Sequence, residues 1–299
     1  MNVLSASRFN PHPSLYQVIS MTSYLAQFPA DVLGLIASRL PLDDAKKLAA
    51  VDECVRDRVL AAPRAFLPTS DPTKQLFSIV DDDSLRQWID PLRRMGANID
   101  AVTNDTIGDT ALILAASRGV GLRVKNLIAA GADVNVASID GTTALVAAAK
   151  GGNYQQVNQL LEAGAVVDAA DIDGNTALFM AACSGDSSCV FQLIAAGADV
   201  NATNDYGATA LFPAAWRGHG VCMQQLIAAG ADVNATNGSL ETALMLSALY
   251  GHDSCVRQLI AASANVNAID KHGNTALDLA VRDGHESCVR QLIAAGARD

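Results

Sequence analysis

Short apolar stretches alternate with polar loops from about residue 73 onward, and the pattern returns every 33 residues. Residues 176–202 read TALFMAACSGDSSCVFQLIAAGADVNA, and residues 209–235 read TALFPAAWRGHGVCMQQLIAAGADVNA. Each copy holds two apolar segments of helical spacing, separated by a glycine and followed by a loop rich in Asn, Asp and Gly. A fixed period in this range predicts a solenoid of stacked helix pairs, so the expected fold class is all-α.

The residues that recur in every unit have identifiable structural roles. A threonine opens each unit, and its hydroxyl is expected to cap the first helix. These threonines are Thr110, Thr143, Thr176, Thr209, Thr242 and Thr275. A glycine then ends each helix where a left-handed turn is needed.

Three residues depart from the repeated pattern. Pro213 lies one turn into its helix and removes a backbone donor near Thr209. Ser263 replaces a glycine that is expected to be left-handed. Leu240 stands where the glycine of a hairpin belongs, so we expect that loop to turn differently, at Gly238.

The 33-residue helix–helix–hairpin unit resembles the ankyrin repeat, with Thr-Ala-Leu where that family has Thr-Pro-Leu-His. The resemblance covers residues 73–299 and implies six regular units after one degenerate unit at residues 73–100. In that family, the hairpin tips and the residues just before the first-helix glycine contact protein partners. The resemblance therefore implies a substrate-binding set. Its members are Arg118, Lys150, Tyr206, Trp216, Arg217, Leu249 and Tyr250.

Trp216 is the most informative member of this set. Trp, Tyr and Arg side chains dominate the binding energy of many interfaces, and Tyr206, Arg217 and Tyr250 are placed on the same or neighbouring units. The alternative is that Trp216 packs on the next unit and fills the space left by small alanines.

The segment before the repeats has a different pattern. We expect four parts: residues 1–22 disordered, 23–66 a small helical domain, 67–72 a proline-rich linker, and 73–299 the repeat domain. The helical part is close to the lower size limit for independent folding, and its apolar residues outnumber what three short helices can bury. It therefore either caps the solenoid or presents an apolar surface to a partner.

The stretch at residues 28–60 is similar to an F-box. The matching residues are Phe28, Pro29, Ile36, Leu40, Pro41, Leu48 and Val51, and Val32 and Leu33 lie on the same apolar face. Asp52 and Glu53 follow Val51, where the family usually has a cysteine and then basic residues and a tryptophan. The resemblance implies binding to the Skp-type adaptor of a cullin-RING ubiquitin ligase.

The charge of the chain narrows the range of partners, and its cysteines indicate the compartment. The chain has 21 Lys and Arg against 31 Asp and Glu, and the excess of acid lies in the repeats. An acidic surface repels phosphate, so we expect neither a nucleic acid nor a membrane partner. Four of the six cysteines recur 33 residues apart, which predicts buried free thiols and a cytoplasmic location.

No grouping of catalytic or metal-ligating residues survives the alignment of the repeats, so we expect a non-enzymatic protein without a cofactor. His219, His252 and His285 recur at the turn between paired helices, which indicates a structural role. The function predicted is the substrate receptor of an SCF-type ligase. The alternative is a plain ankyrin scaffold or inhibitor module. The layout resembles proteins that intracellular bacteria and large DNA viruses use in the host cytosol, so the expected functions include that of a pathogen effector.

Overall fold

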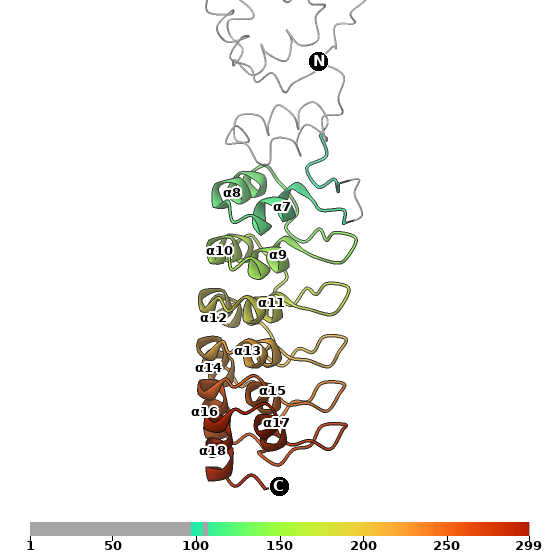
Figure 1. Ribbon diagram of the computed structural model, residues 1–299. Helices are drawn as coiled ribbons and strands as arrows, with labels where there is room; N and C mark the ends of the chain where they lie inside the picture. The colour runs from blue at the N-terminus through green and yellow to red at the C-terminus, as the bar shows by residue number, and fades with distance from the viewer. Residues whose placement is uncertain (1–96, 104–106, 299) are drawn as a thin grey trace, which may run out of the picture. The chain divides into compact units, whose positions relative to one another are not determined.

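The computed structural model describes residues 97–103 and 107–298. The predicted parts 1–22, 23–66 and 67–72, most of the degenerate unit and all F-box-like residues lie outside the described residues. The helices of the described part are labelled α7 to α18, as in Figure 1. Their bounds are α7 Ala111–Ser117, α8 Gly121–Ala129, α9 Ala144–Lys150, α10 Tyr154–Glu162, α11 Ala177–Ser184, α12 Ser187–Ala195, α13 Leu211–Arg217, α14 Gly220–Ala228, α15 Ala243–Leu249, α16 Asp253–Ala261, α17 Ala276–Arg282 and α18 Glu286–Ala294.

The twelve helices form six antiparallel pairs stacked in chain order. The odd-numbered first helices pack on one another in one row, and the even-numbered second helices form a second row beside it (Figure 1). A hairpin projects beside the first-helix row between consecutive pairs, and within the described residues its pairing is limited to isolated β-bridges. The predicted all-α solenoid with six regular units is confirmed.

Threonine caps begin five of the six first helices. At Thr176, for example, the hydroxyl accepts a hydrogen bond of 3.3 Å from the N–H of Phe179, and the carbonyl accepts the N–H of Met180. The expectation is wrong at Thr209. Pro213 stands in the place of Met180 and has no N–H, so the N–H of Phe212 bonds to the Thr209 carbonyl at 3.0 Å instead of to the hydroxyl. The buried Thr209 hydroxyl is left without a hydrogen-bond partner.

Two alanine substitutions are expected to show that Thr176 and Thr209 contribute differently to stability. Thr176→Ala should lower the free energy of unfolding by about 1 kcal/mol, because it removes a working cap. Thr209→Ala should cost clearly less, because the hydroxyl that it removes has no partner. Urea denaturation of the two variants in parallel measures both values, and equal losses would contradict the assignment of the cap.

Left-handed residues close both helices and the hairpin of each unit. The predicted glycines have positive φ, among them Gly218 at 75° and Gly230 at 91°. Ser263 keeps the same conformation at 66°, as expected. The expectation that the loop turns at Gly238 is wrong, because Leu240 itself adopts φ 57° and preserves the hairpin of the other units.

Leu240→Gly is expected to raise the free energy of unfolding by about 0.5–1 kcal/mol, because it relieves left-handed strain at an exposed side chain. Leu240→Ala is the matched control, since it shortens the side chain and leaves the strain in place. Thermal and urea unfolding should show a gain for the glycine variant alone, and an equal gain for alanine would mean that the left-handed strain is not the cause.

The interior is built from small apolar side chains that leave little exposed surface. Cys189, Cys222, Cys255 and Cys288 are buried and free, one in each of four consecutive units, as predicted. Burial raises the pKa of the Cys222 thiol to about 11, and burial with a hydrogen bond to Asp253 raises the pKa of Cys288 to about 12. These thiols are therefore uncharged at neutral pH and act as small core residues.

Candidate protein-binding surface

Most of the predicted binding residues lie at the C-terminal ends of the first helices, along one edge of the first-helix row. Lys150, Arg217 and Leu249 are the last residues of α9, α13 and α15, while Arg118 and Tyr250 are the C-caps of α7 and α15. All are exposed except Leu249, which is partly buried. The edge formed by the C-terminal ends of the first helices therefore presents side chains that differ from unit to unit.

Three of the predicted residues meet in one cluster. The rings of Trp216 and Tyr250 pack edge to face with centroids 6.3 Å apart and an angle of 60° between their planes. The guanidinium carbon of Arg217 lies 5.0 Å from the centre of the Trp216 ring, which is the geometry of a cation–π contact. Trp216 and Tyr250 are nevertheless 45% and 48% exposed. Trp216 thus packs on the next unit, as one reading of the sequence expected, and still offers a large apolar face to a partner.

His252 belongs to the same cluster, although its recurrence at the turn between paired helices indicated only a structural role. Its ring stacks on Tyr250 with centroids 6.3 Å apart, and its Nε2 lies 2.9 Å from the carbonyl oxygen of Trp216. The structural role is also confirmed, because His285 makes the same contact with the carbonyl of Leu249 at 3.0 Å. The sequence signal for this stacking was the position of His252, which follows the exposed Tyr250 by two residues. We call Trp216, Arg217, Tyr250 and His252 the aromatic cluster.

Arg118, Lys150 and Tyr206 do not join this cluster. Arg118 and Lys150 lie on the first and second helix pairs, whereas the cluster lies on the fourth and fifth. Tyr206 stands on a hairpin tip, where its backbone N–H bonds to Asn204 and its carbonyl accepts the N–H of Gly238. Its side chain is 66% exposed. The sequence therefore predicted one compact group and several separate exposed positions.

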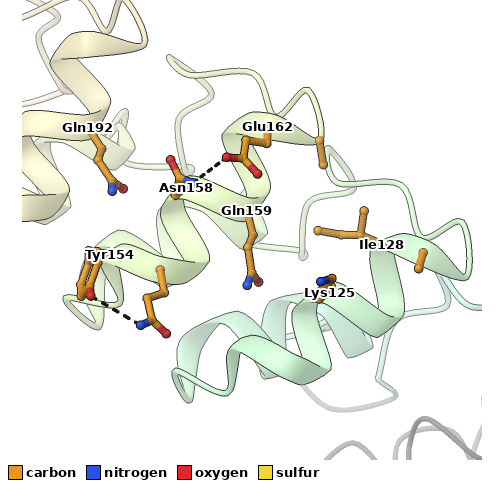
Figure 2. A pocket seen from close by; sticks show the side chains of 10 residues that line it. Lys125, Ile128, Tyr154, Asn158, Gln159, Glu162 and Gln192 are labelled. Atoms are coloured by element: carbon orange, nitrogen blue, oxygen red, sulfur yellow. Dashed lines mark hydrogen bonds between the residues drawn. The ribbon is translucent and has the colours of Figure 1, made fainter.

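An open depression of about 740 Å³ lies on the second-helix row, between α8, α10 and α12. Figure 2 shows Lys125, Gln159 and Glu162 around it, with Glu162 bonded to Asn158 at 2.7 Å. Sites for small molecules are mainly apolar, and this depression is lined largely by amide and charged side chains. It contains none of the predicted binding residues and is not a candidate site.

The described residues hold no group of three His, Cys, Asp or Glu side chains arranged to bind a metal ion. Within the same residues, no helix is long and apolar enough to span a membrane.

Stacked helix pairs joined by projecting hairpins place the chain among the solenoid repeat proteins. The family model for ankyrin repeats, built on three copies, matches residues 86–171, 157–237 and 211–298, so the chain belongs to the ankyrin repeat family. Repeats of this family mediate protein–protein interaction.

One solved structure, the ankyrin repeat domain of human ASB11, is similar to the chain at 32% sequence identity with a TM-score of 0.60. The match covers 64% of this chain and 85% of that one. No curated protein matches the chain.

Proposed function

We propose that the protein is a non-enzymatic substrate receptor of an SCF-type ubiquitin ligase, working without a cofactor. In this proposal, residues 28–51 bind a Skp-type adaptor, and the ankyrin array holds a protein substrate through the aromatic cluster. The role requires a cytoplasmic location, which is the host cytosol if the protein is a pathogen effector. The observation that carries the substrate half is the exposure of Trp216 and Tyr250 beside Arg217.

The aromatic cluster suits partner binding because its side chains are already ordered. Trp216 is held by Tyr250 on one side and Arg217 on another, so little rotational entropy is lost when a partner covers it. Arginine and the large aromatics are also the residue types that most often dominate interface energies. The four side chains come from two neighbouring units, so a partner that covers them spans the boundary between these units.

Trp216→Ala is expected to weaken capture of the substrate by about 30-fold, which corresponds to about 2 kcal/mol for a central aromatic side chain. The measurement is quantitative mass spectrometry of proteins that co-purify with the native chain and the variant. Phe191→Ala is the control, because Phe191 is an aromatic residue on α12 in the second-helix row and is even more exposed, at 63% against 45% for Trp216. Equal loss in both variants would contradict the placement of the site.

The adaptor half of the proposal rests on the register of Phe28-Pro29, Ile36, Leu40-Pro41, Leu48 and Val51 in the sequence. Co-purification of the native chain with a purified Skp-type adaptor tests it. A variant with Ile36→Asp and Leu40→Asp places two charges on the proposed apolar contact and should lose the adaptor. If the native chain does not retain the adaptor, the ligase role is wrong.

A second candidate is an ankyrin scaffold or inhibitor module in which residues 24–66 only cap the solenoid. The acidic Asp52 and Glu53, and the absence of a tryptophan after Val51, favour this alternative. Limited proteolysis separates the two candidates, with deletion of residues 1–66 as the variant. A cap is indicated if the deletion exposes the first repeats to cleavage, and a receptor arm if it leaves them resistant.

A further inference from the structure

Basic side chains recur along the edge formed by the C-terminal ends of the first helices. Arg118 is the C-cap of α7, and Lys150, Arg217 and Arg282 are the last residues of α9, α13 and α17. All four are exposed. We call these four residues the basic edge. It is a local exception in an acidic protein, because the whole chain has 31 Asp and Glu against 21 Lys and Arg.

The helix dipole alone does not account for the basic edge. A cation at the C-terminal end of any helix is stabilised by roughly 0.3–1 kcal/mol, so the dipole favours basic residues in both helix rows. Yet none of the second helices, α8, α10, α12, α14, α16 and α18, has a basic residue in its last turn. The cations are restricted to the row that carries the aromatic cluster, which indicates a role in binding rather than in helix stability.

The positive charge available to a partner lies between the start of the array and the aromatic cluster. Beyond the cluster, Arg282 is neutralised, because its guanidinium donates to both carboxylate oxygens of Asp283 at 3.0 and 3.3 Å. Within the described residues, neither Lys150 nor Arg217 takes part in an ion pair. These two cations lie on the second and fourth helix pairs, and the second of them belongs to the aromatic cluster.

Arg217 connects the charged and the apolar parts of this surface. Its guanidinium carbon lies 5.0 Å from the centre of the Trp216 ring. An arginine that packs over an aromatic ring can still hold a carboxylate through two parallel N–H donors. Trp216 and Tyr250 beside it remain 45% and 48% exposed. A matching partner therefore places a carboxylate next to a large apolar side chain.

We propose that the basic edge and the aromatic cluster together bind an acidic protein segment with a large apolar residue at one end. The apolar residue covers Trp216 and Tyr250, and a neighbouring carboxylate pairs with Arg217. Further carboxylates pair with Lys150 and Arg118. The inference rests on the proposed function of the array as a substrate-binding module and specifies the chemistry of the substrate.

A protein segment fits this surface better than a nucleic acid does. A nucleic acid carries a negative charge on every nucleotide, so it also meets the acidic remainder of the array. A protein segment can confine its carboxylates to the residues that face the basic edge.

The stacking of the units sets the length of the segment. Consecutive first helices pack directly on one another from α7 through α9 and α11 to α13 (Figure 1), and packed helices lie about 8–10 Å apart. The three steps from Trp216 back to Arg118 therefore cover roughly 24–30 Å. An extended chain spans this distance with about seven to nine residues.

The test is fluorescence anisotropy of a labelled peptide, in which about eight Asp and Glu residues precede a Phe-Leu pair, titrated with the full chain. We expect saturable binding that weakens as salt rises. The same peptide with Asn and Gln in place of Asp and Glu should bind clearly less well. Equal binding of the two peptides, or tighter binding of a single-stranded oligonucleotide of similar length, would overturn the proposal.

Charge variants away from the aromatic cluster locate the site. Arg118→Gln together with Lys150→Gln should weaken binding of the acidic peptide about tenfold, because two exposed ion pairs are lost. Lys125→Gln together with Arg257→Gln removes the same charge from exposed positions of the second-helix row and should leave the affinity unchanged. Equal weakening by the two double variants would contradict the proposal.

The outcome separates this inference from the proposed function. If the chain captures a cellular substrate but does not bind the acidic peptide, the inference about the basic edge is wrong and the receptor function stands. If the peptide binds and the Skp-type adaptor does not, the ligase role is wrong and the inference about the basic edge stands.

Discussion

Replacing Leu226 by alanine is expected to lower the free energy of unfolding by about 3 kcal/mol, the typical cost of a cavity at a fully buried leucine. Leu226 has no exposed surface and lies in α14, which packs on α12, α13 and α16. An interior core built of alanine and leucine cannot collapse easily into the space left behind, because neighbouring units hold both helix rows in place. The measurement is the shift of the urea midpoint followed by circular dichroism.

Val221→Ala on the same helix is the control for this prediction. Val221 is mostly exposed, so its substitution should change stability by less than about 0.5 kcal/mol. A similar loss in both variants would mean that α14 is destabilised as a helix and not by a cavity at Leu226.

Gly218→Ala is expected to cost about 2–3 kcal/mol, the second largest effect, because two penalties coincide. Gly218 has φ 75°, which is unfavourable for a residue with a Cβ. The added Cβ would also lie 2.6 Å from Nδ1 of His252, so this ring must move. Since His252 stacks on Tyr250 and bonds to the carbonyl of Trp216, the same variant should disturb the aromatic cluster.

Gly230→Ala isolates the backbone penalty. Gly230 has φ 91°, and a Cβ there meets nothing within 4 Å, so about 1 kcal/mol is expected. Urea unfolding measures the loss of unfolding free energy in both variants, and tryptophan fluorescence reports on the aromatic cluster. If the two alanine variants lose equal stability, the contact between position 218 and His252 has no energetic weight.

The period of 33 residues was sufficient to predict the six helix pairs, because each recurring residue has a local role. The capping threonines and the left-handed glycines act within one turn of their own position, so their pattern determines the start and end of each element. Ser263 could be assigned a left-handed conformation for the same reason: it occupies a glycine position, and the turn around it is otherwise unchanged.

The two wrong predictions concern residues whose local structure is changed by other residues of the chain. Thr209 has the right residue type for a cap, and Pro213 redirects the donor that it needs. Leu240 was expected to move the turn, yet the bonds between adjacent hairpins hold it in the left-handed conformation despite the strain. Both outcomes depend on energies that the pattern of apolar and polar residues does not contain.

The sequence predicted which residues form the candidate site better than it predicted how they contact one another. The position before the first-helix glycine identified Trp216, Arg217 and Tyr250, whereas their mutual contacts and the stacking of His252 depend on how two units pack. The F-box-like segment remains a prediction, because it lies outside the described residues.

The loops of successive units are joined by the same bond at several junctions. The side-chain oxygen of Asn201 accepts the N–H of Asp232 at 2.8 Å, and that of Asn234 accepts the N–H of Asn265 at 2.7 Å. At six junctions a side-chain oxygen accepts a backbone N–H of the next loop, from Asn at four and from Asp100 and Asp168 at two. Removing or adding a whole unit would therefore preserve this bond at the new junction. The array can therefore change length by genetic exchange between its own copies, and its reach can evolve separately from the side chains that recognise a partner.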